Sequence, residues 1–277
     1  MADILEAIGL ASQATAWQAV LLTAISFGVG VLGGFVGLAL GTMRLPALLL
    51  LGFPAPVAAG TNILVSALSA LTGSIRHVRE RRVDWRVVGV MGIPAVIGSF
   101  LGGFLSGRVN EELLIALAGV FVVWQGVELT RRGWRERTAP EQRVGEARQE
   151  RFTPGRMTAE TGIGLGVGLL GGAVGLILGS IRLPAMVRIL GIDPRVAAGT
   201  NLVIGLLMGA AGFVGHGVQG EVDGLLLVLM GISGMIGTWY GARLTGRVRL
   251  STLILVMGLV LLVVGLLLLG DAYLRTS

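Results

Sequence analysis

The chain has 277 residues, of which 53% are hydrophobic and 14% are charged, and its mean hydropathy is +0.83. Soluble domains carry about 25% charged residues, so this composition excludes a soluble globular protein and indicates a polytopic α-helical membrane protein. The net charge of +6 comes from arginine alone, and the arginines lie between apolar segments, which favours membrane orientation over nucleic-acid binding.

Apolar segments follow one another along the chain in two similar sets. The first set comprises residues 17–41, 45–52, 57–75, 87–106 and 113–129, and the second comprises 161–179, 183–191, 196–214, 224–242 and 251–270. We therefore expect the domains to be an N-terminal extracytoplasmic segment 1–16, a first membrane repeat 17–130, a cytoplasmic arginine-rich linker 131–158, a second membrane repeat 159–270 and a C-terminal tail 271–277.

The two sets are copies of one unit. Residues 33–47 read GGFVGLALGTMRLPA and residues 171–185 read GGAVGLILGSIRLPA, at an offset of 138. The string AAGTN at 58–62 recurs at 197–201, at an offset of 139 that persists to the end of the unit. A duplicated, glycine-rich, apolar half is typical of a secondary transporter built from two repeats.

Arginine placement predicts that the two repeats have opposite orientations. Residues 76–86 hold five arginines and the linker holds eight, so both are expected in the cytoplasm. The repeat counterpart of the first loop, GHGVQGEVD at 215–223, has no arginine and is expected outside. An inverted repeat follows, with both termini outside the bacterial cytoplasmic (inner) membrane.

The first two segments of each repeat are too short to be two ordinary crossings. Residues 45–52 cannot span about 30 Å of hydrocarbon alone. We expect a broken or re-entrant pair of short helices in each repeat, meeting near Gly33–Gly34 and Gly171–Gly172, followed by three transmembrane helices. The whole chain then has 8–10 membrane segments. Whether 45–52 re-enters or crosses stays open at this point.

Two arginines lie inside these apolar stretches. Arg44 and Arg182 each occur in an Arg-Leu-Pro triplet. An intramembrane arginine costs about 2.5 kcal/mol or more and usually faces a cavity or a partner. The guanidinium geometry suits oxyanions, so a basic anion pocket is predicted. The alternative is that each arginine extends to the membrane interface or caps helix carbonyls. Pro46 and Pro184 follow, either breaking the helix or beginning it.

Other polar residues repeat with them. Thr61–Asn62 and Thr200–Asn201 open an apolar segment shortly after a proline, where helix N–H groups favour anions; capping is the alternative. His77 and His216 lie at equivalent segment ends, and Glu128 lies near a membrane interface. These three are candidates for gating or a proton relay, although structural roles are more common. No metal site, cofactor or enzymatic motif is expected.

The ordered set of motifs resembles the sulfite exporter TauE/SafE family of anion permeases. The resemblance lies in GGFVGLALGTMRLPALLLLGFP, VAAGTN, VDWR and GIPAVIGSFLGGFLSGRV, most of which recurs in the second half. It implies transport of small sulfur-containing or organic anions. The pocket that it implies comprises Gly33, Gly34, Pro46, Thr61, Asn62, Gly171, Gly172, Pro184, Thr200 and Asn201. One departure is that the position two before the proline, often apolar in the family, is arginine here.

The expected function is therefore alternating-access transport, in the direction of export, of a small oxyanion such as sulfite or an organosulfonate. The alternatives are a passive anion channel, a carrier of a carboxylate or thiosulfate, and a membrane scaffold that acts through the basic linker. The expected partners are the anion, membrane lipid and a second copy of the chain in a homodimer, with no nucleic acid.

Overall fold

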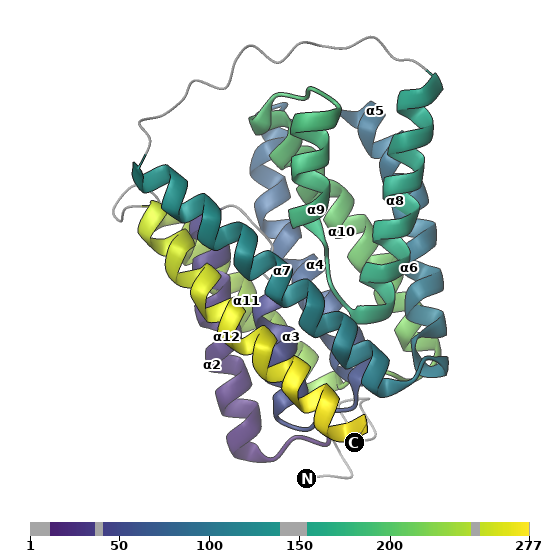
Figure 1. Ribbon diagram of the computed structural model, residues 1–277, viewed down its shortest axis with the longest axis vertical. Helices are drawn as coiled ribbons and strands as arrows, with labels where there is room; N and C mark the ends of the chain where they lie inside the picture. Colours follow the sequence, from purple (N-terminus) through teal and green to yellow (C-terminus); the bar gives the residue numbers. More distant parts are fainter. Residues whose placement is uncertain (1–11, 37–40, 139–153, 245–249, 277) are drawn as a thin grey trace.

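The computed structural model describes residues 12–36, 41–138, 154–244 and 250–276, and in these ranges all regular structure is helical (Figure 1). Eight of the described helices are long and apolar enough to cross a membrane. They span Ala16–Gly34, Ala55–Arg79, Trp85–Arg108, Glu111–Arg135, Met157–Val174, Pro194–Val218, Gly224–Gly241 and Ser251–Arg275. The predicted all-α polytopic membrane protein is confirmed.

The first half begins with one long helix and one short one. The elements in order are α2 (Ala16–Val36), α3 (Gly41–Leu50), α4 (Ala55–Arg79), α5 (Trp85–Val87), the π-helical η1 (Val88–Gly92), α6 (Ile93–Leu105), the 3-10 turn η2 (Ser106–Arg108) and α7 (Glu111–Thr138). Pro54 precedes α4, and the Asp84 carboxylate caps α5 by accepting from the N–H groups of Arg86 and Val87.

The second half repeats this order. It comprises α8 (Pro154–Val174), α9 (Gly179–Pro184), the π-helical η3 (Ala185–Ile189), α10 (Pro194–Val218), α11 (Gly224–Leu244) and α12 (Leu250–Thr276). With a rise of about 1.5 Å per residue, the ten residues of α3 reach only about half-way through a bilayer. The predicted short helices are therefore present in both halves, as α3 and as α9 with η3.

The helices of the two halves are interleaved. α2 packs along α11, and its second-half counterpart α8 packs along α6, the counterpart of α11 (Figure 1). α7 packs along α12, and α4 packs against α10. Glycines allow these close approaches: a Cβ at Gly98 would lie 2.5 Å from the carbonyl oxygen of Leu165, and one at the equivalent Gly237 would collide with that of Phe27.

The break in each half lies later than the glycine pairs predict. α2 continues through Gly33 and Gly34 to Val36, and α8 continues through Gly171 and Gly172 to Val174. The non-helical stretch of the second half is 175–178, and residues 37–40 of the first half lie outside the described residues. The glycines do not break the helix because they serve packing: a Cβ at Gly172 would collide with the carbonyl oxygen of Ser99.

The predicted boundaries at the linker and the tail also shift. α7 extends to Thr138 and α8 begins at Pro154, so both helices run into the predicted linker 131–158. Residues 139–153 of that linker lie outside the described residues. The predicted tail is the last turn of α12, which reaches Thr276. These helix ends carry arginines. A boundary drawn from composition therefore assigns them to the linker or the tail and not to a membrane helix.

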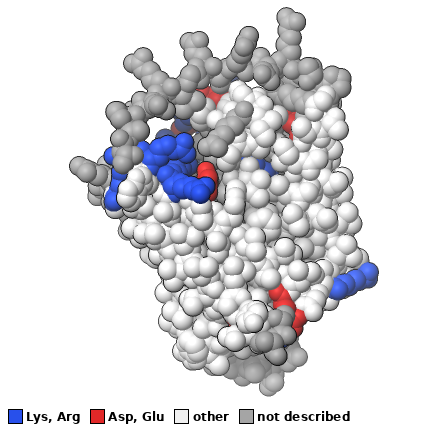
Figure 2. Space-filling view, in the orientation of Figure 1, with Lys and Arg blue, Asp and Glu red and all other residues white. Residues whose placement is uncertain are grey.

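Basic side chains are concentrated at one end of the molecule. In the view of Figure 2 they gather near the upper end, whereas acidic side chains lie at both ends. The upper end holds the C-terminal ends of α4 and α7 and the start of α10, with the exposed arginines Arg76, Arg79, Arg81, Arg86, Arg131, Arg135, Arg137 and Arg195. Among the described residues, the arginines at the lower end are Arg108 and Arg275 alone.

Candidate functional site

The candidate site is built around two arginines on the short helices. Arg44 of α3 is 1% exposed and Arg182 of α9 is 0% exposed, so both guanidinium groups are fully buried. Each is followed two residues later by a proline inside the helix, Pro46 or Pro184. A proline in that position has no N–H to give to the carbonyl four residues earlier, which weakens the helix on the side of the arginine.

Arg44 has a single hydrogen bond among the described residues. Its Nη2 donates to Ser69 Oγ of α4 at 3.2 Å, while Nε and Nη1 are buried without a partner. A Cβ at Gly234 of α11 would lie 3.6 Å from Nη1 and 3.0 Å from Ser26 Oγ of α2. Nη1, one of the two nitrogens without a partner, therefore lies close to Gly234 and to the Ser26 hydroxyl.

Further unpartnered polar atoms surround the same helix. Thr42 Oγ1, Asn62 Oδ1 and Ser66 Oγ are buried without a hydrogen-bond partner. Asn62 Nδ2 donates to the carbonyl of Gly41 at 3.1 Å, and a Cβ at Gly41 would collide with Ser66 Oγ. Asn62, Ser66 and Ser69 are spaced along one face of α4, which places them together against α3. We call Thr42, Arg44, Asn62, Ser66 and Ser69 the Arg44 cluster.

Arg182 lies in a less polar setting. Its Nε donates to Asn201 Oδ1 at 3.1 Å and its Nη1 lies 3.0 Å from Met208 Sδ, which leaves Nη2 without a partner. Met208 occupies the position equivalent to Ser69, and Gly205 occupies that of Ser66. Around Arg182, one guanidinium nitrogen thus lacks a hydrogen-bond partner. Around Arg44, two guanidinium nitrogens and three side-chain oxygens lack one.

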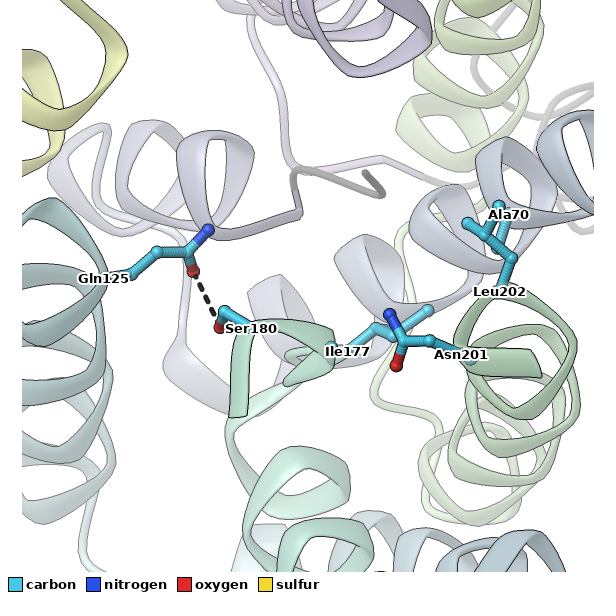
Figure 3. Close-up of a pocket in the computed structure, with 8 residues that line it drawn as sticks. Ala70, Gln125, Ile177, Ser180, Asn201 and Leu202 are labelled. Carbon is cyan, nitrogen blue, oxygen red and sulfur yellow. Dashed lines mark hydrogen bonds between the residues drawn. The ribbon is translucent and has the colours of Figure 1, made fainter. Parts of the chain in front are cut away.

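A pocket adjoins Arg182. It is lined by Ala70, Gln125, Ile177, Gly179, Ser180, Asn201, Leu202 and Gly205. Figure 3 shows Gln125 of α7 directed at Ser180 of α9, with Ile177 between them and Asn201 of α10. The Ser180 hydroxyl lies 3.5 Å from Gln125 Oε1. A Cβ at Gly205 would lie 3.5 Å from Arg182 Nη2, so the free nitrogen lies close to a glycine that lines this pocket.

The chemistry of both arginines favours an anion. A buried cation without a counter-charge is costly because it loses its hydration. Among the described residues, neither guanidinium pairs with a carboxylate. Unpaired N–H donors in a fixed planar group match the oxygens of a small oxyanion. The alternative prediction, that each arginine extends to the membrane interface, does not fit this burial, because neither side chain reaches the surface.

The threonines have a different place from the one predicted. Thr61 Oγ1 accepts the N–H of Asp223 at 3.0 Å, and Thr200 Oγ1 accepts that of Asp84 at 2.9 Å. Each hydroxyl thus ties one half of the chain to a loop of the other. Thr61 is the seventh residue of α4, beyond the four N–H groups left free at a helix start. Thr61 therefore lies past the free N–H groups of the helix start, and the predicted anion site there stays a prediction.

The glycine pairs lie in the last turns of α2 and α8, at the break. Gly33 is buried and Gly34 is partly buried. A Cβ at Gly171 would lie 3.0 Å from Met208 Cε, which places this glycine next to the side chain that contacts Arg182. Asn201 is brought to its arginine as the repeat pattern suggests, and Asn62 reaches α3 through Gly41.

The two histidines lie at opposite ends of the molecule. His77 lies at the upper end of α4, where a Cβ at Gly199 would lie 2.9 Å from its own Cβ, and its Nδ1 is buried without a partner. His216 lies at the lower end of α10 and is 0% exposed. Glu128 is partly buried in α7. The structure therefore does not join these three residues in one relay.

Sequence reasoning missed several polar residues. Ser66 and Ser69 follow Asn62 at helical spacing, a signal that identifies them once Asn62 is suspected. Ser26, Ser106 and Glu221 give no such signal, because their hydrogen-bond partners include residues far away in the sequence.

Comparison with known proteins adds an independent line. Residues 22–268 match the family described as Sulfite exporter TauE/SafE. The "Probable membrane transporter protein YunE" of Bacillus subtilis is 25% identical over 261 residues, covering 89% of this chain and 95% of that protein. The protein YdhB of the same organism, with the same description, is 26% identical and covers 81% and 89%. No solved structure matches the chain significantly.

Proposed function

The chain belongs to the sulfite exporter TauE/SafE family of membrane transporters, and from that premise we propose that it carries a small oxyanion, sulfite or an organosulfonate, out of the cell by alternating access. The observation that supports this most directly is the pair of buried guanidinium groups with N–H donors that no described residue accepts. An oxyanion supplies both the missing charge and the missing acceptors.

The short helices support a carrier. α3 has ten residues and α9 has six, too few to cross a bilayer, and each has a proline two residues after its arginine. Helices that are interrupted in corresponding positions of two repeats are typical of transporter binding sites. In this proposal Arg44 and Arg182 supply charge, Asn201 holds Arg182 through its Nε, and Asn62 supplies an amide beside α3. The site opens alternately to the two sides.

The distribution of charge supports an orientation. We place the arginine-rich end in the cytoplasm and both termini outside the inner membrane. Because the chain has no cysteine, single cysteines report directly on this. Gly217 and Gly155 lie at opposite ends, and a Cβ at either has no neighbour within 4 Å. A membrane-impermeant maleimide should label Gly217→Cys in whole cells and Gly155→Cys only after permeabilisation. The reverse pattern would refute the orientation.

Flux in proteoliposomes tests the function. Wild-type protein should release labelled sulfite, and sulfite on the opposite side should accelerate that release, because a carrier exchanges one bound anion for another. The Arg44→Gln/Arg182→Gln variant should lose both signals. The control variant Arg79→Ala/Arg131→Ala removes the same charge from exposed positions and should keep them. Equal flux in both folded variants would contradict an arginine-based anion site.

A further inference from the structure

A buried cluster of ionisable groups lies away from the arginines, at the lower end of the molecule. His216 Nδ1 lies 2.8 Å from Glu221 Oε2, and Ser106 Oγ contacts both, at 3.1 Å from the imidazole nitrogen and by a short hydrogen bond to the carboxylate. His216 Nε2 lies 2.8 Å from the carbonyl oxygen of Gly172 in α8. The histidine side chain is 0% exposed and that of Glu221 is 11% exposed.

The contacts of His216 favour one extra proton on the pair. Both imidazole nitrogens face an acceptor oxygen, one a carbonyl and the other a carboxylate. A neutral imidazole has one N–H and one lone pair, so with an ionised Glu221 one of these contacts would set a lone pair against an oxygen. The arrangement therefore requires an imidazolium beside a carboxylate, or a neutral imidazole beside a carboxylic acid. Either way the pair holds one proton that it can lose.

Few other charges face this pair. η2 brings Arg108, whose guanidinium carbon lies 5.6 Å from the Phe104 ring centroid. Asp223, two residues after Glu221, accepts hydrogen bonds from Ser12 and from the N–H of Leu226. The stretches of α4, α6 and α8 that pack here, 55–62, 93–105 and 165–174, contain no ionisable residue. These three stretches therefore bring no charge to the pair.

A chain of hydrogen bonds connects the proton to the Arg44 cluster. The Gly172 carbonyl that accepts from His216 also accepts the N–H of Gly175, at 3.3 Å, in the turn that ends α8. The carbonyl of Gly175 accepts from Asn62 Nδ2 at 2.9 Å, and the same Nδ2 donates to Gly41. Once the proton is lost, the one remaining imidazole N–H can donate to Glu221 instead of to the Gly172 carbonyl. The turn whose Gly175 carbonyl accepts from Asn62 would then be held less firmly.

The equivalent site of the first half lacks this chemistry. His77 corresponds to His216, but the position of Glu221 is taken by Arg82, whose guanidinium lies 2.7 Å from Glu80. The counterpart of Ser106, residue 245, lies outside the described residues. Among the described residues, the proton-holding pair thus occurs at one end only, with Glu221 at its partly exposed edge.

We propose that Ser106, His216 and Glu221 form a proton-binding site that couples anion export to proton entry from the arginine-poor side. When the site is protonated, the 172–175 turn keeps its hydrogen bond to the Asn62 amide, and anion binding is disfavoured. When the proton leaves toward the arginine-rich side, the Asn62 amide becomes available to the anion. One proton then enters for each anion that leaves. This inference rests on the proposed oxyanion transport and adds its coupling ion.

The test measures proton and anion movement together. Proteoliposomes are loaded with labelled methanesulfonate, which stays ionised at neutral pH, and with a pH-sensitive dye. Wild-type efflux should acidify the lumen and should run faster with acid outside. Glu221→Gln and the milder Ser106→Ala should lose the lumenal acidification, while labelled anion still exchanges. Arg82→Gln, at the equivalent position of the first half, should keep the acidification.

The outcomes separate the two proposals. Anion efflux from wild type without proton movement would overturn the coupling site and leave the oxyanion carrier standing. Proton movement that persists in folded Glu221→Gln and Ser106→Ala variants would also overturn it. If wild type moves neither methanesulfonate nor sulfite, the proposed function fails, and the coupling site fails with it.

Discussion

The unequal surroundings of the two arginines lead to a quantitative prediction about anion affinity. Arg44 has two buried nitrogens without a partner and Arg182 has one. We consider the single variants Arg44→Gln and Arg182→Gln, which remove the charge but keep a side chain of similar reach. If the anion binds at the free donors, Arg44→Gln should weaken binding more.

The size of the difference follows from the number of hydrogen bonds. A hydrogen bond that involves a charged group contributes about 1.5–3 kcal/mol. Loss of two such bonds with Arg44 costs about 3 kcal/mol or more, and loss of one with Arg182 costs about 1.5 kcal/mol. Since about 1.4 kcal/mol corresponds to a tenfold change, the dissociation constant should rise about 100-fold for Arg44→Gln and about tenfold for Arg182→Gln.

Equilibrium binding of labelled sulfite to purified protein measures both constants. A second readout separates binding from folding: removal of an uncompensated buried charge should raise the thermal unfolding temperature of the anion-free protein in both variants. Equal losses of affinity, or a greater loss for Arg182→Gln, would refute the reasoning from unpartnered nitrogens. A lower unfolding temperature would show that the guanidinium groups stabilise the protein in the absence of an anion.

Three other substitutions test the site and the packing. Ser69→Asp places a carboxylate beside Arg44 Nη2, so the protein should stay folded but lose sulfite binding, as a binding assay would show. Gly98→Ala should reduce the yield of folded protein in size-exclusion chromatography, because its Cβ would meet the backbone of α8, whereas Gly89→Ala has no neighbour within 4 Å and should not. Thr61→Ala removes the acceptor of the Asp223 N–H and should destabilise the protein by about 1 kcal/mol in thermal unfolding, with Thr61→Ser as the control that restores it.

The sequence predicts those features of this fold that depend on local pattern. The duplicated strings, the apolar lengths and the arginines within them are enough to predict helical segments, short helices and two buried cations. The role of Thr61 was not predictable in this way, because its hydroxyl bonds to a residue 162 positions away. The same holds for Ser106 and Glu221, 115 positions apart. The break after α8 was misplaced because glycine permits both a broken helix and a close helix contact, and only the partner helix decides between them.

The interleaving of the halves has a consequence for the synthesis of the protein. α2 is complete at Val36, but its partner α11 ends only at Leu244, about 200 residues later. At about 5–20 residues per second, the ribosome takes roughly 10–40 s to supply that partner. During this interval the face of α2 that carries Ser26 has no α11 carbonyl to accept its hydroxyl, although in the finished protein it donates to Met230 at 2.7 Å. The nascent first half must therefore wait in the membrane, held by lipid or by the insertion machinery, until the last helices arrive.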